Sequence, residues 1–385
     1  MLMSDKKVRF GVIGVGGMGT GHCNMIPKIP ETTLTCVCDV NPATLEAVSK
    51  KYGVPGFASH LELLESGLVD AVVIAAPHYF HPPIAEDAFE RGIHVMSEKP
   101  LSVTVSAADR MIAAAKKSGL KFSVMYQMRG FPECQAARKV IESGVLGEIY
   151  RTNLVMGWYR SQAYYDSGGW RATWSGEGGG VLINQAPHFL DLFTWLGGLP
   201  SKVTGQTRTR LHDIEVEDEA FATLEYSNGA HGYLYASTTE VPGHTMLEIC
   251  GDKGKLVLHG SDLKVFLIDP SIKEFTHEST EMWAGPKSAI SPVELPVRGE
   301  IKDHGFITQN FARAILFNEP LISPGEEGLN AVELINSLIL SSKTGKTVSI
   351  PVVREEYDAL LSELVANSAA KTNVREQRVT DPKFA

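Results

Sequence analysis

A glycine-rich segment near the start of the chain has the spacing needed to hold a phosphate-bearing ligand through backbone N–H groups. It reads Gly14-Val15-Gly16-Gly17-Met18-Gly19, a G-x-G-x-x-G pattern that directly follows the apolar run 8–13. Such glycines permit a tight turn and close approach of a pyrophosphate, whose charge then lies at a helix N-terminus. We therefore expect the backbone of Gly14, Gly16, Gly17, Met18 and Gly19 to bind a dinucleotide.

An acidic side chain, Asp39, follows the apolar run 34–38. A carboxylate at the end of a second strand can accept hydrogen bonds from the adenosine ribose hydroxyls and would repel a 2′-phosphate. The next residues, Val40, Asn41 and Pro42, bring no cation. The sequence thus favours NAD over NADP, with Asp39 and Val40 as cofactor contacts.

A lysine follows a third apolar run, in the segment Glu98-Lys99-Pro100 after residues 93–96. The carboxyl ends of strands in an open parallel sheet line the ligand crevice, so Lys99 is expected to point toward a nicotinamide. A lysine in a loop is otherwise a solvated charge, and the residues alone leave both interpretations open.

A titratable cluster follows a second glycine run, Gly178-Gly179-Gly180. A helix beginning near residue 183, with Pro187 in its first turn, would place Asn184, His188 and Asp191 on one face. An imidazole oriented by a carboxylate is a plausible general base. A polar helix face turned to water is the alternative, but the glycines favour close approach to a ligand or a neighbouring strand.

Six aromatic residues lie within 17 positions and are interleaved with charges. Aromatic faces against C–H surfaces, together with charged groups for hydroxyls, suit a saccharide. We expect about half of these rings to belong to a hydrophobic core. The sequence has no second cluster of basic residues that would indicate a sugar phosphate as the substrate. The residues are Trp158, Tyr159, Tyr164, Tyr165, Trp170 and Trp174, with Arg160, Asp166 and Arg171.

The pattern of apolar runs predicts two kinds of architecture. Residues 1–128 alternate short β-branched runs with helical stretches, as in parallel βαβ units, and Asn41-Pro42 marks a helix start. From about residue 145 the runs are strand-like, and Asn228-Gly229 is a hairpin turn signal. We therefore expect an α/β doubly wound parallel sheet over 1–128, followed by an α+β domain over 129–385.

Composition excludes several classes of protein. A chain of 385 residues is longer than one hydrophobic core usually supports, so we expect two domains. A net charge of −9 does not favour binding to nucleic acid or to an anionic membrane. Five cysteines at irregular spacing, with no C-x-x-C, indicate neither a disulfide framework nor a metal site. The first ten residues hold no apolar leader and no long apolar run follows, so we expect a cytoplasmic protein.

Together, Gly14 to Gly19, Glu98-Lys99-Pro100 and the glycine run leading to His188 and Asp191 resemble the Gfo/Idh/MocA family of oxidoreductases. The resemblance covers nearly the whole chain. It implies a Rossmann domain and then a domain with a large, mostly antiparallel open sheet that mediates homodimers or homotetramers. Members oxidise or reduce a secondary hydroxyl or ketone of sugars and cyclitols with NAD(P).

The resemblance also implies roles for individual residues. Lys99 would hydrogen-bond the reacting oxygen and His188 would exchange its proton, although Lys99 itself as the base is an alternative. Many members have Asp where this chain has Asn184, so here the amide would only position a hydroxyl. Further cofactor contacts would be Pro77, His78, His81, Glu98, Lys99, Gln127, Trp170 and Arg171, with Arg129 nearby, and substrate contacts Lys99, Trp158, Tyr159, Arg171, Asn184 and His188.

The finer expectation is oxidation at C3 of an unphosphorylated glucoside, because the segment 164–171 with Asn184-Gln185 resembles dehydrogenases that act on levoglucosan or form 3-keto sugars. Inositol 2-dehydrogenation is the near alternative. An NAD-dependent glycoside hydrolase that oxidises C3 transiently, and a non-catalytic NAD-binding sensor, are rivals from other classes.

Overall fold

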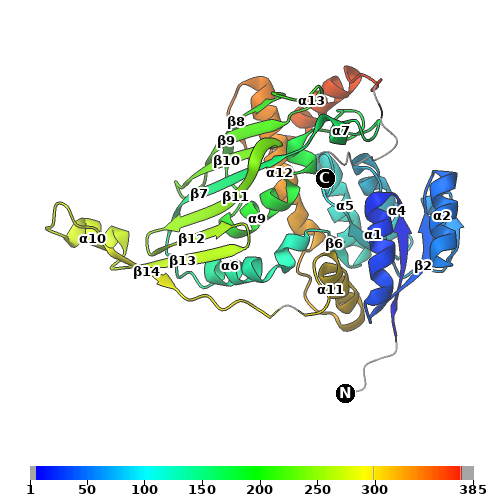
Figure 1. Ribbon diagram of the computed structural model, residues 1–385, viewed down its shortest axis with the longest axis horizontal. Helices are drawn as coiled ribbons and strands as arrows, with labels where there is room; N and C mark the ends of the chain where they lie inside the picture. The colour runs from blue at the N-terminus through cyan, green and yellow to red at the C-terminus, as the bar shows by residue number, and fades with distance from the viewer. Residues whose placement is uncertain (1–5, 298, 373, 375–385) are drawn as a thin grey trace. The chain divides into compact units, whose positions relative to one another are not determined.

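The computed structural model describes residues 6–297, 299–372 and 374 of the chain (Figure 1). The chain forms two compact units, one of residues 1–135 and 295–332 and one of residues 136–294 and 333–385. A single domain boundary was expected after residue 128, but residues 295–332 also belong to the first unit. The reason is packing, because the Phe311 ring lies 6.1 Å from that of Phe10 within one buried cluster.

The first unit contains a parallel sheet with strand order β3-β2-β1-β4-β5-β6. The order reverses between β1 and β4, and at such a switch point the strand ends leave a crevice for a ligand. This arrangement confirms the expected doubly wound sheet. The strands are β1 Val8–Ile13, β2 Thr32–Cys38, β3 Gly56–Phe57, β4 Ala71–Ile74, β5 His94–Ser97 and β6 Phe122–Val124.

Helix α2 of the first unit begins where the Asn41-Pro42 pair indicates a helix start. The Asn41 side chain accepts a hydrogen bond from Thr44 N at 2.9 Å, and Gly53 ends the same helix with a φ of 65°. The helices of the first unit are α1 Gly17–Met25, η1 Ile26–Lys28, α2 Pro42–Tyr52, α3 His60–Glu65, η2 His78–Phe80, α4 His81–Glu90, α5 Val105–Ser118, η3 Gln127–Gly130, α11 His304–Phe317 and η4 Gly325–Glu327.

The second unit contains a nine-stranded sheet with order β14-β13-β12-β11-β7-β10-β9-β8-β15. Neighbouring strands are antiparallel except β7 and β10, which confirms the expected mostly antiparallel sheet. The predicted turn at Asn228-Gly229 joins β9 to β10, with a φ of 86° at Gly229. The strands are β7 Ile149–Tyr159, β8 Lys202–Arg208, β9 Glu219–Glu225, β10 His231–Ser237, β11 Thr239–Gly251, β12 Gly254–His259, β13 Asp262–Asp269, β14 Lys287–Ser291 and β15 Val348–Ser349.

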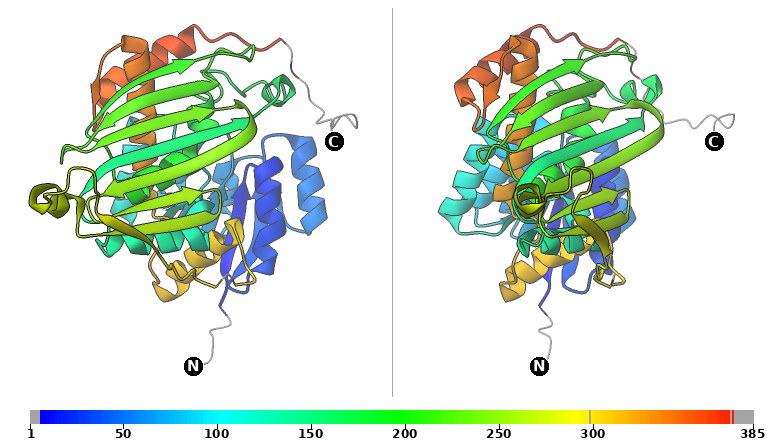
Figure 2. Two further views of the ribbon diagram at one scale, coloured as in Figure 1. Left: turned by 60° about the vertical axis from the view of Figure 1, so that its left-hand side comes forward. Right: turned by 90° about the vertical axis from the view of Figure 1, so that its left-hand side faces the viewer.

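Helices α9 and α12 cover one face of this sheet, and on the side of the other face α10 projects from the sheet with no buried residue (Figure 2). Leu338 of α12 lies so close to the strand β8 that a Cβ on Gly205 would come within 2.9 Å of it. The open face was expected. The helices are α6 Pro132–Glu142, α7 Gln162–Tyr165, α8 Val181–Asn184, α9 Pro187–Gly197, α10 Ile272–Glu278, α12 Gly328–Thr344 and α13 Arg354–Ala366, of which α6 and α12 begin in the first unit.

All five cysteines lie in the described part of the chain, where they are buried thiols outside any disulfide, as expected. Burial raises the pKa of Cys36 to about 11, so this thiol is unreactive at neutral pH. Within the part of the chain that the structure describes, no helix is both long enough and apolar enough to span a bilayer.

Candidate functional site

The glycine turn after β1 combines two crowded positions with one open position. A Cβ on Gly14, where φ is 84°, would lie 2.7 Å from Ala76 N, and a Cβ on Gly19 would lie 1.8 Å from Gly14 O. A Cβ on Gly16 would meet no atom of the described residues within 4 Å. Two glycines therefore close the turn and the third leaves the space that a pyrophosphate needs in front of α1, so the residues present fit a dinucleotide.

The Asp39 carboxylate is fixed at the same turn. Its Oδ2 atom accepts a hydrogen bond from Val15 N at 2.9 Å, and its Oδ1 atom accepts one from Asn41 N at 2.9 Å. Each oxygen keeps a lone pair for a ribose hydroxyl. The neighbouring Val40 side chain is 87% exposed, so it is open to contact with a ligand.

The segment after β4 contains the exposed Pro77 and two buried histidines. His81 has no exposed surface, and its ring nitrogens lie 2.8 Å from Ala76 O and 2.9 Å from Pro100 O. Burial lowers the pKa of His81. His81 therefore braces the turn that carries Lys99 and Pro100, which differs from the direct cofactor contact expected, and the 6% exposure of His78 leaves little surface for one.

Glu98 faces helix α1, and its expected cofactor contact stays a prediction. Its Oε1 atom lies 2.7 Å from His22 Nε2, and its Oε2 atom accepts a hydrogen bond from Lys99 N at 3.2 Å. Burial acts to raise the pKa of Glu98, but the hydrogen bond and charge of His22, with the nearby charges of His304 and Lys99, lower it to about 2. The buried Glu98 carboxylate is therefore an anion in direct contact with the backbone of Lys99.

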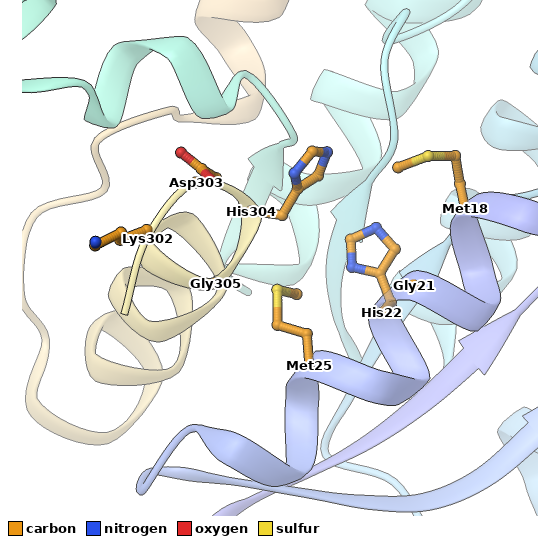
Figure 3. A pocket seen from close by; sticks show the side chains of 8 residues that line it. All are labelled: Met18, Gly21, His22, Met25, Lys302, Asp303, His304 and Gly305. Atoms are coloured by element: carbon orange, nitrogen blue, oxygen red, sulfur yellow. The ribbon is translucent and has the colours of Figure 1, made fainter. Parts of the chain in front are cut away.

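A cavity of about 220 Å³ lies beside this ion pair, between α1 and the start of α11 (Figure 3). The side chains of Met18, His22, Met25 and His304 converge on it, and the rings of His22 and His304 lie 6.0 Å apart. Lys302 and Asp303 point away from it. The sequence did not indicate this cavity, because residues 302–305 come from the returning segment.

Gln127 and Arg129 lie in η3, the short helix that follows β6. Arg129 is 1% exposed and pairs with Glu327 within the first unit, and its place beside a ligand stays a prediction. Gln127 is half-buried, and its cofactor contact stays a prediction.

In the second unit the glycine run packs against Glu217. A Cβ on Gly180 would lie 1.9 Å from Glu217 O, and Glu217 Oε1 accepts hydrogen bonds from Gly180 N at 3.0 Å and Leu182 N at 3.1 Å. Burial raises the pKa of Glu217. Of the two uses expected for these glycines, the structure shows close approach to a neighbouring segment.

The single helix expected from residue 183 is wrong, because α8 ends at Asn184 and α9 begins at Pro187. Pro187 has no N–H to donate to the carbonyl of Ile183, so the helix cannot run through it. Asn184 and His188 lie on either side of this break and are both half-exposed, whereas Asp191 is 1% exposed.

Asn184 is held by an acid that the sequence analysis missed, Glu177. The Asn184 Nδ2 atom donates to Glu177 Oε1, and the other Glu177 oxygen accepts from Ala172 N at 2.5 Å. Arg171 Nη1 lies 3.7 Å from the same carboxylate, which is 1% exposed. The position of Glu177 between Gly176 and Gly178 is the signal that could have found it.

Tyr164 joins the predicted substrate residues to one another. Its hydroxyl oxygen accepts hydrogen bonds from Arg171 Nη1 at 2.7 Å and Gln185 Nε2 at 3.1 Å. The Arg171 guanidinium also stacks 4.6 Å from the centroid of the Trp170 ring. Tyr164, Trp170 and Arg171 are therefore brought together beside Asn184, the neighbour of Gln185.

Trp158 lies on the other side of the same group. Its ring packs edge-on against Phe189, 5.8 Å away, which follows His188 directly. Tyr159, at the end of β7, is 49% exposed.

Among the described residues no group of three or more His, Cys, Asp or Glu could hold a metal ion.

Two family models match the chain. Residues 8–126 match the oxidoreductase family with an NAD-binding Rossmann fold, and residues 134–257 match the GFO/IDH/MocA C-terminal domain.

Several relatives are enzymes that act on sugars or cyclitols. The chain is 27% identical to the scyllo-inositol 2-dehydrogenase (NAD(+)) of Bacillus subtilis, over 66% of this chain and 74% of the relative. It is 30% identical to the 2,7-anhydro-N-acetylneuraminate hydratase of Escherichia coli, over 65% and 67%. It is 24% identical to the D-glucoside 3-dehydrogenase of Escherichia coli, over 90% and 99%.

Among solved structures, the chain is similar to the WlbA dehydrogenase of Bordetella pertussis in complex with NADH and UDP-GlcNAcA. The identity is 28% and the TM-score 0.76, and the match covers 90% of this chain and 100% of the other.

Proposed function

The chain belongs to the Gfo/Idh/MocA family of NAD-dependent sugar and cyclitol oxidoreductases, and from this we propose that it oxidises one secondary hydroxyl of a sugar, glucoside or cyclitol. The observation that carries the proposal is the group around Asn184 and His188, where the aromatic residues Trp158 and Tyr164 lie beside hydrogen-bonding side chains. This combination suits a saccharide.

In the proposed mechanism, NAD held at the glycine turn would supply the hydride acceptor, and the protein's own side chains handle the proton. Lys99 donates a hydrogen bond to the reacting oxygen, and His188 accepts the hydroxyl proton. Asn184, whose Nδ2 atom donates to Glu177, positions a substrate hydroxyl through its Oδ1 atom. Lys99 as the proton acceptor is the alternative within the same reaction.

We place the reaction at C3 of a glucoside ahead of inositol oxidation. A relative named D-glucoside 3-dehydrogenase matches 90% of this chain, compared with 66% for the inositol dehydrogenase. A second candidate reaction has no net oxidation, with transient C3 oxidation followed by elimination of the glycosidic bond. The relative named as a hydratase favours keeping this candidate, because hydration consumes no NAD.

One assay separates these functions. Free sugars, inositols and aryl glycosides are incubated with the protein and NAD, and NADH absorbance and aglycone release are both followed. We expect stoichiometric NADH with a sugar or glucoside. Aglycone release without net NADH would favour the hydrolase, and NAD binding without turnover across the panel would favour a sensor.

We also propose that the protein forms a homodimer or homotetramer through the open face of the nine-stranded sheet. Tyr233 on β10 is 50% exposed, and Phe221 on the adjacent β9 is half-buried under Arg208. Light scattering of the wild type and of Tyr233→Lys tests this, with a fall in mass expected for the variant.

A further inference from the structure

Arg160 is a cation without a carboxylate among the described residues. It follows β7, is half-buried, and lies 4.8 Å from the ring centroid of Trp158 and 5.1 Å from that of Tyr164. Its Nη1 atom donates to Tyr159 O at 3.0 Å, whereas its buried Nε atom has no hydrogen-bond partner in the described structure. Within residues 6–297, 299–372 and 374, no Asp or Glu pairs with this guanidinium, whereas Arg171 has Glu177 as such a partner.

Arg171 extends the same feature from the other side of Tyr164. Its guanidinium lies 4.4 Å from the Tyr164 ring centroid, so both arginines contact one ring. Arg171 is 9% exposed, and its Nε atom also lacks a hydrogen-bond partner among the residues described. Its charge is offset by Glu177 at 3.7 Å, so the uncompensated charge in this pair is that of Arg160.

The arginine pair is directly connected to the proposed substrate residues. Trp158, beneath Arg160, packs against Phe189, the residue after His188. Tyr164, between the two arginines, accepts a hydrogen bond from Gln185, the residue after Asn184. Arg160 therefore contacts Trp158, which packs next to His188, and Tyr164, which bonds next to Asn184. All of these residues belong to one compact unit.

A partly buried guanidinium without a counter-ion is costly, and stacking on aromatic rings offsets only part of that cost. Its planar fork matches the two oxygens of a carboxylate. A neutral sugar would leave the charge uncompensated. A phosphate monoester, with a charge near −2 at neutral pH, calls for a second free cation, and Arg171 is already opposed by Glu177.

We propose that the substrate is a sugar acid, and that Arg160 binds its carboxylate while Arg171 and Tyr164 hold Arg160 in place. The inference rests on the proposed function and narrows its substrate class. It also explains why two arginines stack on one tyrosine beside the proposed saccharide site.

The test uses matched pairs of sugars that differ only at C6, such as methyl glucoside with methyl glucuronide and galactose with galacturonate, together with glucose 6-phosphate. Initial rates of NADH formation give kcat/KM for each compound. For wild-type protein we expect the acid of the preferred pair to exceed the neutral sugar by about tenfold or more, chiefly through KM. Raising the salt concentration should increase KM for the acid more than for the neutral sugar.

In Arg160→Gln the ratio of acid to neutral kcat/KM should fall about tenfold, and Arg160→Lys should retain part of it because the charge remains without the fork. Arg110→Gln is the matched control, since Arg110 is an exposed helix residue paired with Glu86, and its ratio should equal that of the wild type. Thermal unfolding of each variant establishes that the fold is retained.

Calorimetric binding of each sugar to the protein–NADH complex gives a readout that needs no turnover. Tighter binding of the acids, lost in Arg160→Gln, supports the inference. Equal or tighter binding of the neutral sugars overturns it while leaving the proposed oxidation intact, and preference for glucose 6-phosphate replaces the carboxylate with a phosphate and also overturns it. Absence of NADH with every compound, despite binding of the acids, overturns the proposed oxidation and not the substrate class.

Discussion

The Nε2 atom of His22 lies 2.7 Å from the Oε1 atom of Glu98, and the other oxygen of that carboxylate accepts the backbone N–H of Lys99. A histidine–carboxylate pair that is almost wholly buried therefore lies next to the lysine that we expect to contact the substrate. The pKa of Glu98 is lowered to about 2, so its contribution to stability is fully present above its ordinary value of 4.5 and is lost as pH falls from there toward 2.

Replacing His22 by Leu should leave this carboxylate buried without its partner and reduce stability at pH 7 by about 3 kcal/mol. Burial then raises the pKa of Glu98, so protonation relieves the loss and the gap to wild type should narrow below about pH 5. Urea unfolding between pH 4 and 8 measures this. His22→Gln, which keeps a donor, is the control, and equal stability of the Leu and Gln variants at pH 7 would contradict the argument.

The two kinds of glycine in the first turn predict two different failures. Gly16→Ala should fold with a stability within about 1 kcal/mol of wild type, because its Cβ meets no neighbour among the described residues. It should nevertheless bind NADH at least about tenfold more weakly, because the methyl group fills the space for the pyrophosphate.

Gly19→Ala should instead lose about 3 kcal/mol of stability, since its Cβ would lie 1.8 Å from Gly14 O. Thermal unfolding and NADH fluorescence titration on both variants separate the two effects. Normal NADH binding by Gly16→Ala would remove this turn from the cofactor site.

Asp39 should decide between the two nicotinamide cofactors. Asp39→Asn removes the charge that would repel a 2′-phosphate, so NADH affinity should fall about tenfold while the preference over NADPH narrows. Fluorescence titration with both cofactors tests this. Glu46→Gln, an exposed acid on α2, should change neither affinity, and a wild type that prefers NADPH would overturn the role of Asp39.

Local patterns in the sequence were sufficient to predict both sheets and the cofactor turn. Strand β1, the Asn41 cap and the Asn228-Gly229 hairpin each depend on neighbours within a few residues. The features that were not predicted depend on contacts between residues far apart along the chain. His22 and Glu98 are 76 positions apart, and α11 joins the first unit through Phe311 and Phe10, which no local pattern indicates.

The site in the second unit shows the same limit at shorter range. Asn184 and His188 were recognised as a pair, but spacing alone could not reveal the helix break at Pro187. Glu177 was overlooked because its importance comes from the atoms around it, namely Ala172 N, Asn184 Nδ2 and the Arg171 guanidinium. The carboxylate that the family resemblance implies at position 184 is absent here, and the Glu177 carboxylate contacts the Asn184 side chain instead.

That arrangement predicts a rescue. Glu177→Gln replaces one acceptor by a donor, so the Asn184 amide can no longer keep its oxygen toward the substrate, and kcat should fall about tenfold with NAD affinity unchanged. Adding Asn184→Asp restores an acceptor beside the introduced amide, so the double variant should recover activity and show a new ionisation in its acid limb. Glu225→Gln, an exposed acid of β9, is the control, and no recovery in the double variant would contradict the positioning role.

Lys99 and His188 should differ in what their loss does to the pH profile. Lys99→Ala should reduce turnover about a hundredfold while keeping NAD affinity within a few-fold, because in the proposed mechanism the lysine contacts the reacting oxygen whereas the glycine turn binds the dinucleotide. Lys116→Ala, an exposed lysine of α5, should match the wild type in both measurements. In His188→Ala the ionisation of the general base should disappear from the plot of kcat/KM against pH, whereas in Lys99→Ala it should persist at reduced rate. An ionisation that vanishes with Lys99 and survives the loss of His188 would assign the proton transfer to the lysine.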